Sequence, residues 1–531
     1  MSSAVRPPLR AALPLFYTCL SMSYSAAIDQ LSAMTPELYT QPGQIRRKFS
    51  LAEIGTLLDA LGNPHRRFRS ILIAGTNGKG STASTLASIL AASGLRTGLY
   101  TSPHLTRPNE RIRINGVEIS DDDFAALYFR VHDCGRQLVA GSPSLEGGAP
   151  SDRSTSVGRK ELVLEQKEPK LAQLPSFFET LTAMAFLHFA ESSPGSTVDI
   201  AVLEVGMGGR LDATNIVDPL LSIVTDISLD HTEWLGPTIT AIAREKAGIL
   251  RTNGTLITLP QHPEANQILG EVATELNVRA ISAVPYMPAT VPHAAPGLAP
   301  SSREIATPES YPVEVLGSTI EVASPLQGAH QHRNIALAIA AAAELATQHS
   351  VPITPDSIAT GIRETKWPAR LERICTSGAE YILDVAHNPA GAWALRAALR
   401  GLLHLGEPDA QPATLIFSCL RDKPVAEMAQ ILFPLFDQVI FAPIHSSRAT
   451  PMSELLAAAA ITGTPARAAD SVAEALEWAE AAPMASNTLA SNPRAATHAL
   501  RVVAGSVYLV GEIRPLLLSR VATNLCIGTR Q

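Results

Sequence analysis

One stretch of this chain, residues 70–82 (SILIAGTNGKGST), constrains its fold more than any other. Apolar residues at its start predict a buried strand, the glycine-rich run 75–80 predicts a tight turn, and two hydroxyl residues open a helix. Glycines in such a turn let backbone N–H groups converge on an oxyanion, and the helix N-terminus adds partial positive charge. Lys79 can reach the outer phosphates of a nucleotide while a hydroxyl faces Mg²⁺. We therefore predict a nucleotide-binding loop formed by Thr76, Asn77, Gly78, Lys79, Gly80 and Ser81. A loop that serves only as a tight turn is the alternative, which the flanking strand and helix disfavour.

The segments after this loop continue an α/β pattern. A small-residue helix over 81–93 and a strand over 97–101 follow the first strand in the order of a parallel unit. Doubly wound sheets place ligands at the carboxyl ends of their strands. Ser102 follows the second strand and could meet a metal bound to the phosphates, although a Ser-Pro pair alone indicates only a turn.

Two later strands are predicted to end at the same edge of the sheet. The strand 200–203 breaks at Glu204, whose carboxylate is positioned to hold Mg²⁺ or to form a salt bridge. The strand 220–226 brings His231 to this edge. A histidine is more often a hydrogen-bonding residue, and Mg²⁺ prefers oxygen, so the chemistry alone does not select His231 as a ligand.

Composition limits the class of protein. The 531 residues, 46% of them hydrophobic, can bury the cores of two domains. The net charge of −7 without a basic block argues against a nucleic-acid partner. No segment predicts a membrane span. Five scattered cysteines favour a reducing, cytoplasmic compartment over a disulfide framework or a zinc site. They are Cys19, Cys134, Cys375, Cys419 and Cys526.

The first residues imitate a short signal peptide, because Arg6 and Arg10 precede an apolar run. Pro14 interrupts that run and no convincing cleavage pattern follows. We expect residues 1–21 to be a non-native or disordered extension, with Met22 as the true start.

The chain resembles the folylpolyglutamate and dihydrofolate synthases of the Mur-ligase superfamily. The resemblance rests on six motifs that occur in the family's order. They are GTNGKG followed by Ser81, NERIRING at 109–116, EVGMGGRLDATN at 204–215 with Met207 in place of leucine, LQGAHQHRN at 326–334, PAR at 368–370 and DVAHNP at 384–389.

The resemblance implies an α/β fold with two domains. An N-terminal P-loop-type Mur-ligase ATPase domain with a mainly parallel sheet would span 22–367, and a smaller Rossmann-like α/β glutamate-ligase domain would span 368–531. The hinge would lie at 366–373, a strand at 381–383 would open the second domain, and 506–510 would be its last strand. Gly, Ser, Pro and charged residues predict an insertion at about 140–175, and a Pro- and Ala-rich composition predicts one at about 285–312. A third insertion is expected at 484–497.

The resemblance also assigns metal ligands and catalytic residues. Ser102, Glu204 and His231 would hold magnesium, with two ions expected. Lys246 corresponds to a lysine that is carbamylated in the family, and its carbamate would help to bind the second ion. An ordinary helix-face lysine is the alternative. Lys79, Lys246 and His231 are the predicted catalytic residues.

Further residues are assigned to the nucleotide and to the folate. Asn334 would touch ATP, with N-capping as its alternative. Arg370 would reach ATP from the linker, and Asp384 would accept from the ribose hydroxyls or the adenine side. Either ring of Phe177 and Phe178 could instead belong to the core. The predicted substrate-binding residues are Ser176, Phe177, Phe178, Glu179, Leu211, Asp212, Ala213 and His387.

The resemblance implies an ATP-dependent amide ligase that adds L-glutamate to dihydropteroate, to the glutamate tail of reduced folates, or to both. It would act as a monomer on small molecules, with neither nucleic acid nor membrane as a partner. A peptidoglycan Mur ligase is one alternative, but it needs a UDP-sugar domain for which the segment before Gly75 is too short. A P-loop ATPase switch is another, but it explains neither the Glu204 loop nor the DVAHNP segment.

Overall fold

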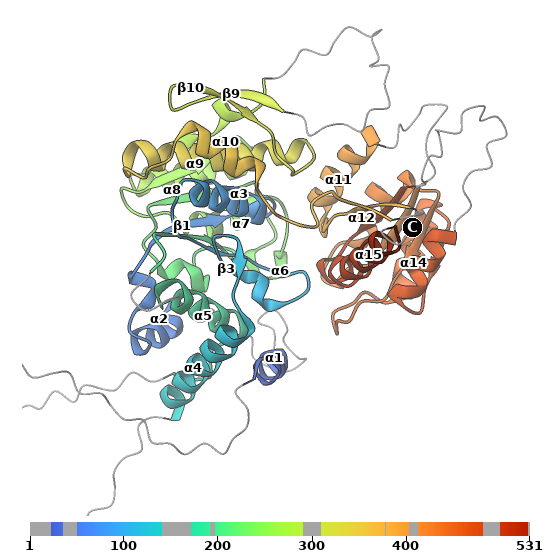
Figure 1. Ribbon diagram of the computed structural model, residues 1–531, viewed down its shortest axis with the longest axis horizontal. Coiled ribbons are helices and arrows are strands. Elements are labelled where there is room, and N and C mark those ends of the chain that lie inside the picture. Colours follow the sequence, from blue (N-terminus) through green and yellow to red (C-terminus); the bar gives the residue numbers. More distant parts are fainter. Residues whose placement is uncertain are drawn as a thin grey trace, which may run out of the picture.

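The chain folds into two α/β domains joined by a short linker (Figure 1). The computed structural model describes residues 23–34, 50–140, 171–191, 197–289, 310–376, 379–402, 413–481 and 500–528. The predicted extension 1–21 and the predicted insertion 484–497 lie outside these residues, as does most of the other two insertions. The expected end of the second insertion at Pro312 is wrong, because Tyr311 and Pro312 already belong to a strand.

An eight-stranded sheet forms the centre of the N-terminal domain, in the order β4-β3-β2-β5-β1-β6-β7-β8. Six strands run parallel, and β3 and β4 are antiparallel at one edge. Both β1 and β5 are almost wholly buried, as expected for parallel strands covered on both faces. The strands are β1 (Arg69–Ala74), β2 (Thr97–Tyr100), β3 (Ile112–Ile114), β4 (Val117–Glu118), β5 (Ile200–Glu204), β6 (Leu221–Val224), β7 (Thr255–Thr258) and β8 (Arg279–Ser282).

Helices cover both faces of this sheet (Figure 1). One face packs against α3 (Lys79–Ala92), α9 (Ala329–Gln348) and α10 (Pro355–Arg363), with the hairpin of β9 (Tyr311–Val315) and β10 (Ser318–Val322). The other packs against α1 (Tyr24–Ala33), α2 (Leu51–Ala60), α4 (Asp121–Ala140), α5 (Phe177–Glu191), α7 (Ile239–Ala247) and α8 (Pro263–Glu275). The short helix α6 (Thr232–Leu235) lines the cavity between the two domains that is described below. Small residues let α3 fit closely between its neighbours: a Cβ on Gly361 of α10 would lie 2.3 Å from the Cα of Ile89.

The C-terminal domain has a six-stranded sheet in the order β11-β12-β16-β13-β14-β15, with only β11 antiparallel. Its strands are β11 (Glu372–Cys375), β12 (Glu380–Leu383), β13 (Ala413–Phe417), β14 (Gln438–Phe441), β15 (Ala466–Ala468) and β16 (Leu500–Ala504). Its helices are α11 (Pro389–Leu402), α12 (Val425–Leu432), α13 (Met452–Thr462), α14 (Val472–Ala481) and α15 (Val507–Gly528).

Two sequence-based expectations for this domain are wrong. The predicted strand 506–510 begins α15, and the strand is β16, just before it. The buried residues Leu509, Val510, Ile513 and Leu517 of α15 recur at helical spacing, which a short apolar window does not reveal. In addition, β11 opens the domain as an antiparallel edge strand, ahead of the strand predicted at 381–383.

Candidate active site

The predicted nucleotide-binding loop connects β1 to α3, which begins at Lys79, two residues earlier than expected. Gly75 and Gly78 have φ values of +149° and +91°. A Cβ on Gly75 would lie 1.8 Å from Oγ1 of Thr225, and a Cβ on Gly78 would lie 2.1 Å from Oδ1 of Asn334. Both positions therefore require glycine. The ammonium of Lys79 donates to the carbonyl of Thr76 in the same loop at 3.2 Å.

Asn334 lies inside α9 and faces the loop. The helix begins five residues earlier, after Gly328, so the N-capping alternative is wrong. The Nδ2 of Asn334 donates to Oε1 of Gln331 at 2.8 Å, and its carbonyl oxygen is the atom that crowds Gly78.

The contact between Gly78 and Asn334 predicts the effect of one methyl group. We expect Gly78→Ala to weaken nucleotide binding by about tenfold or more, because the loop must move away from α9. Gly94→Ala is the matched control, since Gly94 also has a positive φ of +83° but a Cβ there has nothing within 4 Å. The control should lose about 1–2 kcal/mol of unfolding free energy through backbone strain and keep its nucleotide affinity. Calorimetric titration with ADP and denaturant unfolding measure the two effects, and equal affinities in both variants would contradict this view of the loop.

Two predicted metal ligands meet beside the loop. Glu204 is the last residue of β5 and pairs in register with Ile73 of β1. Its Oε2 accepts from the backbone N–H of Ser102 at 3.1 Å. Burial raises the pKa of Glu204, and the charges of Lys79 and Arg370 act against that rise.

His231 follows the end of β6 in a left-handed conformation, with φ +51°. Its backbone N–H donates to Oδ1 of Asp230 at 2.9 Å. Burial lowers the pKa of His231 to about 4, so the imidazole is neutral at pH 7 and has a lone pair to offer.

Lys246 is buried on α7, and 4% of the residue is exposed. Its Nζ donates to the carbonyl oxygen of Gly75 in the loop at 2.6 Å. Burial lowers the pKa of Lys246, and the nearby charge of Lys79 lowers it further, to about 7. The amine of Lys246 therefore lies directly behind the nucleotide loop and not on an exposed face of α7.

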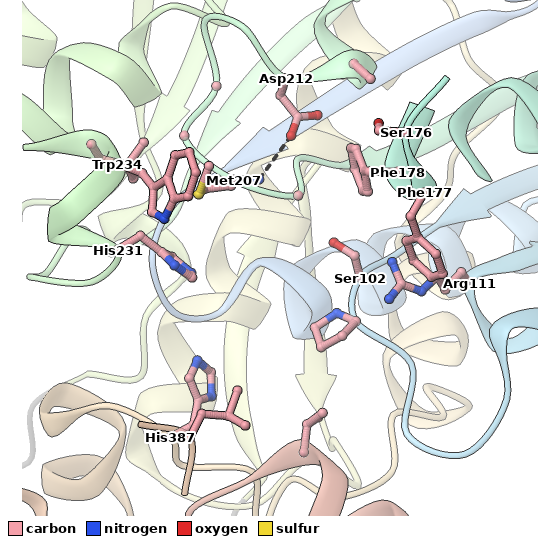
Figure 2. Close-up of a pocket in the computed structure, with 18 of the residues that line it drawn as sticks. Ser102, Arg111, Ser176, Phe177, Phe178, Met207, Asp212, His231, Trp234 and His387 are labelled. Atoms are coloured by element: carbon pink, nitrogen blue, oxygen red, sulfur yellow. Dashed lines mark hydrogen bonds between the residues drawn. The ribbon is translucent and has the colours of Figure 1, made fainter. Parts of the chain in front are cut away.

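A cavity of about 430 Å³ lies between the two domains (Figure 2). Eleven of the predicted site residues line it, namely Ser102, Ser176, Phe177, Phe178, Glu179, Leu211, Asp212, Ala213, His231, Arg370 and His387. The predicted residues that do not line it are Thr76, Asn77, Gly78, Lys79, Gly80, Ser81, Glu204, Lys246, Asn334 and Asp384. The cavity and the loop are adjacent because Ser102, on the cavity wall, bonds to Glu204 beside the loop.

Aromatic rings and a glycine loop form one wall of the cavity. A Cβ on Gly206 would lie 2.6 Å from the ring of Phe178, so this glycine lets the loop pack against the ring. The guanidinium of Arg111 lies 5.3 Å from the centre of the Phe177 ring. Both rings are half-buried and border the cavity, so they are not simply core residues.

Three of the predicted substrate-binding side chains already hold the wall together. Ser176 and Glu179 form a capping box at the start of α5, with bonds of 2.8 and 3.2 Å between side chain and backbone. The carboxylate of Asp212 accepts from the backbone N–H of Met207 at 3.0 Å (Figure 2). Burial raises the pKa of Asp212.

The linker residues shape the edge of the site. Asp384 accepts from the backbone N–H groups of Leu371 at 3.0 Å and Ala386 at 2.9 Å. Arg370 donates to the carbonyl of Ala369 at 2.9 Å while its side chain borders the cavity. Asp384 thus fixes the backbone that carries Arg370 to the site.

Sequence reasoning missed several cavity residues. Arg111 lies in the NERIRING motif, but no role was predicted for it. Its Nε donates to Nδ1 of His104 at 2.9 Å, and burial lowers the pKa of His104 to about 3, which keeps that ring neutral. Lys423 and Arg448 of the C-terminal domain also line the cavity. The motif could have indicated Arg111, whereas no local pattern marks the other two.

The predicted metal ligands fit an ion that arrives with a nucleotide. Within the described ranges, no three His, Cys, Asp or Glu side chains gather as a metal site. Glu204 and Ser102 lie together and offer one carboxylate and one hydroxyl. The imidazole of His231 lies 4.0 Å from Oδ1 of Asp230, and no contact described for it reaches Glu204 or Ser102. Mg²⁺ usually binds through one or two carboxylates together with substrate phosphates and water, which suits this sparse set.

Comparison with known proteins decides the family. Two family models match: the Mur ligase middle domain over residues 163–342 and the Mur ligase glutamate ligase domain over 369–491. Folylpolyglutamate synthase of Lacticaseibacillus casei is 34% identical over 480 residues, which are 87% of this chain and 93% of that protein. The chain belongs to the folylpolyglutamate and dihydrofolate synthase family.

Other family members agree with this assignment. Dihydrofolate synthase/folylpolyglutamate synthase of Bacillus subtilis is 30% identical over 88% of this chain and 95% of its own length. The structure of Mycobacterium tuberculosis folylpolyglutamate synthase complexed with ADP and AMPPCP matches with a TM-score of 0.71 at 30% identity, covering 93% of this chain and 99% of that one. The predicted fold class and the prediction of an ATP-dependent ligase are confirmed. None of the helices in the described ranges combines the length and apolar character needed to cross a membrane.

Proposed function

We propose that this family member uses ATP to join L-glutamate to dihydropteroate, to the glutamate tail of reduced folates, or to both. The observation that supports this most is the cavity between the domains, which the predicted folate-binding residues line beside the nucleotide loop. Relatives in the family carry names for either activity or for both.

The cavity wall suits a folate. The rings of Phe177 and Phe178 offer faces for a flat pterin, and Gly206 of the loop at 206–213 packs against the Phe178 ring. The cationic side chain of Arg111 borders the same space and is suited to a carboxylate of the folate tail or of glutamate. Lys423 and Arg448 also border it, but they are already paired with Asp230 and Asp422.

The nucleotide would occupy the loop, with its phosphates held by backbone N–H groups and by Lys79. Asn334 and Asp384 are proposed nucleotide contacts, and Arg370 would reach the terminal phosphate from the linker. Mg²⁺ would be held by Ser102, Glu204 and His231, and when bound it neutralises phosphate charge.

The reaction then needs two displacements. The acceptor carboxylate attacks the terminal phosphorus of ATP in line, which gives an acyl phosphate and ADP. The glutamate amine attacks the activated carbonyl, and the tetrahedral species expels phosphate. Lys79 and Arg370 stabilise the charge of the transferring phosphoryl group, and the cavity wall aligns the two substrates. The chain supplies positioning and charge, and no side chain acts as a nucleophile.

We also propose that Lys246 is carbamylated. A lysine reacts with CO₂ only as the neutral amine, and burial gives Lys246 a pKa of about 7. The resulting carbamate would carry negative charge toward the nucleotide loop, where it could help to bind a second Mg²⁺.

Carbamylation predicts a pH-dependent signal. The neutral fraction of Lys246 grows as the pH rises through about 7, so CO₂ uptake should increase from pH 6 to pH 8. Carbon-13 NMR of the protein in ¹³C-labelled bicarbonate should show a carbamate resonance in the wild type. Lys246→Arg, which keeps a cation at this position, should lack the resonance. A wild-type spectrum identical to that of the variant would rule out the modification.

Labelled glutamate tests the function directly. The purified protein should incorporate label into dihydropteroate, into a tetrahydrofolate monoglutamate, or into both, and should release ADP over many turnovers only when acceptor and glutamate are both present. Multiple-turnover ADP release at a rate that does not depend on glutamate would contradict the ligase and favour a switch ATPase. The predicted monomeric state and cytoplasmic location stay predictions, and the first can be checked by light scattering.

A further inference from the structure

The linker between the domains carries a tryptophan that lies against the nucleotide loop. The indole of Trp367 is half-buried. A Cβ on Gly80 would lie 2.5 Å from Cζ2 of the Trp367 ring, so the ring fills the space that this glycine leaves open. The hydroxyl of Ser84 on α3 donates to the carbonyl of Lys366 at 3.1 Å and holds the start of the linker on the same helix. The helix that follows the nucleotide loop therefore sets the position of the ring.

Two guanidinium groups lie over the Trp367 ring. The guanidinium carbon of Arg113 on β3 is 5.6 Å from the ring centre, and that of Arg370 is 6.0 Å from it. Both distances are within the range at which an aromatic face attracts a cation. Arg113 also pairs with Glu118 at 3.7 Å. Among the described residues, no ion pair holds Arg370, whose guanidinium donates to the carbonyl of Ala369 beside it. The ring face is therefore the contact that can direct this cation.

The backbone around Arg370 is fixed independently of the ring. Ala369 and Leu371 have φ values of +59° and +50°, a conformation that residues other than glycine rarely adopt. The N–H of Ala369 donates to Oε2 of Glu372 at 2.9 Å. The N–H of Leu371 donates to Oδ2 of Asp384 at 3.0 Å. This strained turn sets where the Arg370 side chain leaves the backbone, and the torsions beyond its Cβ depend on other contacts.

We propose that Trp367 is a positioning residue for Arg370, and that its ring holds the guanidinium toward the terminal phosphate of the nucleotide. The inference rests on the proposed function, in which Arg370 stabilises the transferring phosphoryl group. An arginine side chain has several rotatable bonds, and ordering them to meet a phosphate costs conformational entropy. The ring reduces this cost because it attracts the cation before the nucleotide binds and is itself packed against the loop. Trp367 acts through Arg370 and touches no reacting atom.

Calorimetric titration of the full-length chain with AMPPCP and with ADP separates this role from simple packing. Arg370 is proposed to reach the terminal phosphate, which ADP lacks. We expect Trp367→Leu to weaken AMPPCP binding about fivefold or more and to keep ADP binding within about twofold of the wild type. The kcat for glutamate incorporation should fall about tenfold, with an unchanged KM for the acceptor. Trp367→Phe keeps an aromatic face and should recover most of both losses. Equal losses of AMPPCP and ADP affinity in Trp367→Leu would show that the ring only supports the loop, and would overturn the proposal.

A double variant tests whether Trp367 acts through Arg370. In an Arg370→Ala chain, the further change Trp367→Leu should lower kcat by less than about twofold, because the group that the ring positions is gone. Losses that multiply in the double variant would show a purely structural role and would also overturn the proposal. Trp367→Met covers the case in which Trp367→Leu does not fold. Methionine fills irregular space without offering a ring face, so the losses expected of Trp367→Leu should appear in this variant as well.

Trp478 on α14 provides the matched control. This ring is also half-buried, and the guanidinium carbon of Arg467 lies 4.3 Å from its centre. Trp478→Leu removes the same kind of contact away from the cavity wall, so kcat and both nucleotide affinities should stay unchanged. Wild-type kcat and AMPPCP affinity in Trp367→Leu would overturn the inference and leave the proposed function standing. A wild-type chain that incorporates no glutamate would overturn both.

Discussion

Lys79→Met should lower kcat/KM by roughly a hundredfold to a thousandfold, the range seen when one preorganised donor to a developing charge is removed. Lys79 begins α3 at the end of the nucleotide loop, and its ammonium contacts only a loop carbonyl among the bonds described for it. The charge is therefore free to turn toward a phosphate. Because the side chain is not part of the buried core, the melting temperature should change little.

Steady-state assays with labelled glutamate measure this effect. Lys366→Met is the matched control, since Lys366 is an exposed lysine in the linker and should be dispensable. A Lys79→Met enzyme with wild-type turnover and unchanged dependence on ATP would show that the loop does not hold the transferred phosphate.

Glu204→Gln should lower turnover by about a hundredfold and move the Mg²⁺ requirement to higher concentration. Glutamine keeps an oxygen to accept from the backbone N–H of Ser102, so the loss of turnover reports the effect of removing the negative charge. Burial raises the pKa of Glu204, so the folded state favours the protonated acid. Above the ordinary pKa of a glutamate, folding must bury the ionised carboxylate, and this lowers the free energy of unfolding. The neutral variant should therefore unfold at a higher denaturant concentration at pH 7.

Magnesium titrations of turnover and urea unfolding report the two effects separately. Glu118→Gln serves as the control, because Glu118 sits at the exposed edge of the same sheet in ion pairs with Arg107 and Arg113. A Glu204→Gln enzyme that is slower but has the wild-type Mg²⁺ dependence would remove Glu204 from the metal site.

Local patterns were enough to predict the centre of the N-terminal domain. The turn between β1 and α3 requires glycine because a Cβ at Gly75 or at Gly78 would collide with a neighbouring side chain. The glycine-rich pattern is therefore visible in the local sequence. The meeting of Ser102 and Glu204 follows from the rule that parallel strands end at one edge. The start of α15 was misread because its first apolar residues fit a strand as well as a helix, and only burial over the next two turns separates the two structures.

Contacts between the domains could not be predicted in this way. Asp230 and Lys423 are 193 positions apart, and neither lies in a sequence pattern that predicts contact with the other. Their contact depends on how the C-terminal domain docks, which periodicity and turn chemistry do not specify. The same holds for Arg448, which reaches the cavity only because the domains face each other.

The central claim is that a folate carboxylate takes the terminal phosphate of ATP in the cavity between the domains before glutamate attacks. An acceptor whose reacting carboxylate is labelled with oxygen-18 tests this claim most directly. If the acyl phosphate forms, one labelled oxygen should leave in the inorganic phosphate released for each amide bond made. Phosphate without label, released at the same rate as the amide product, would contradict the mechanism.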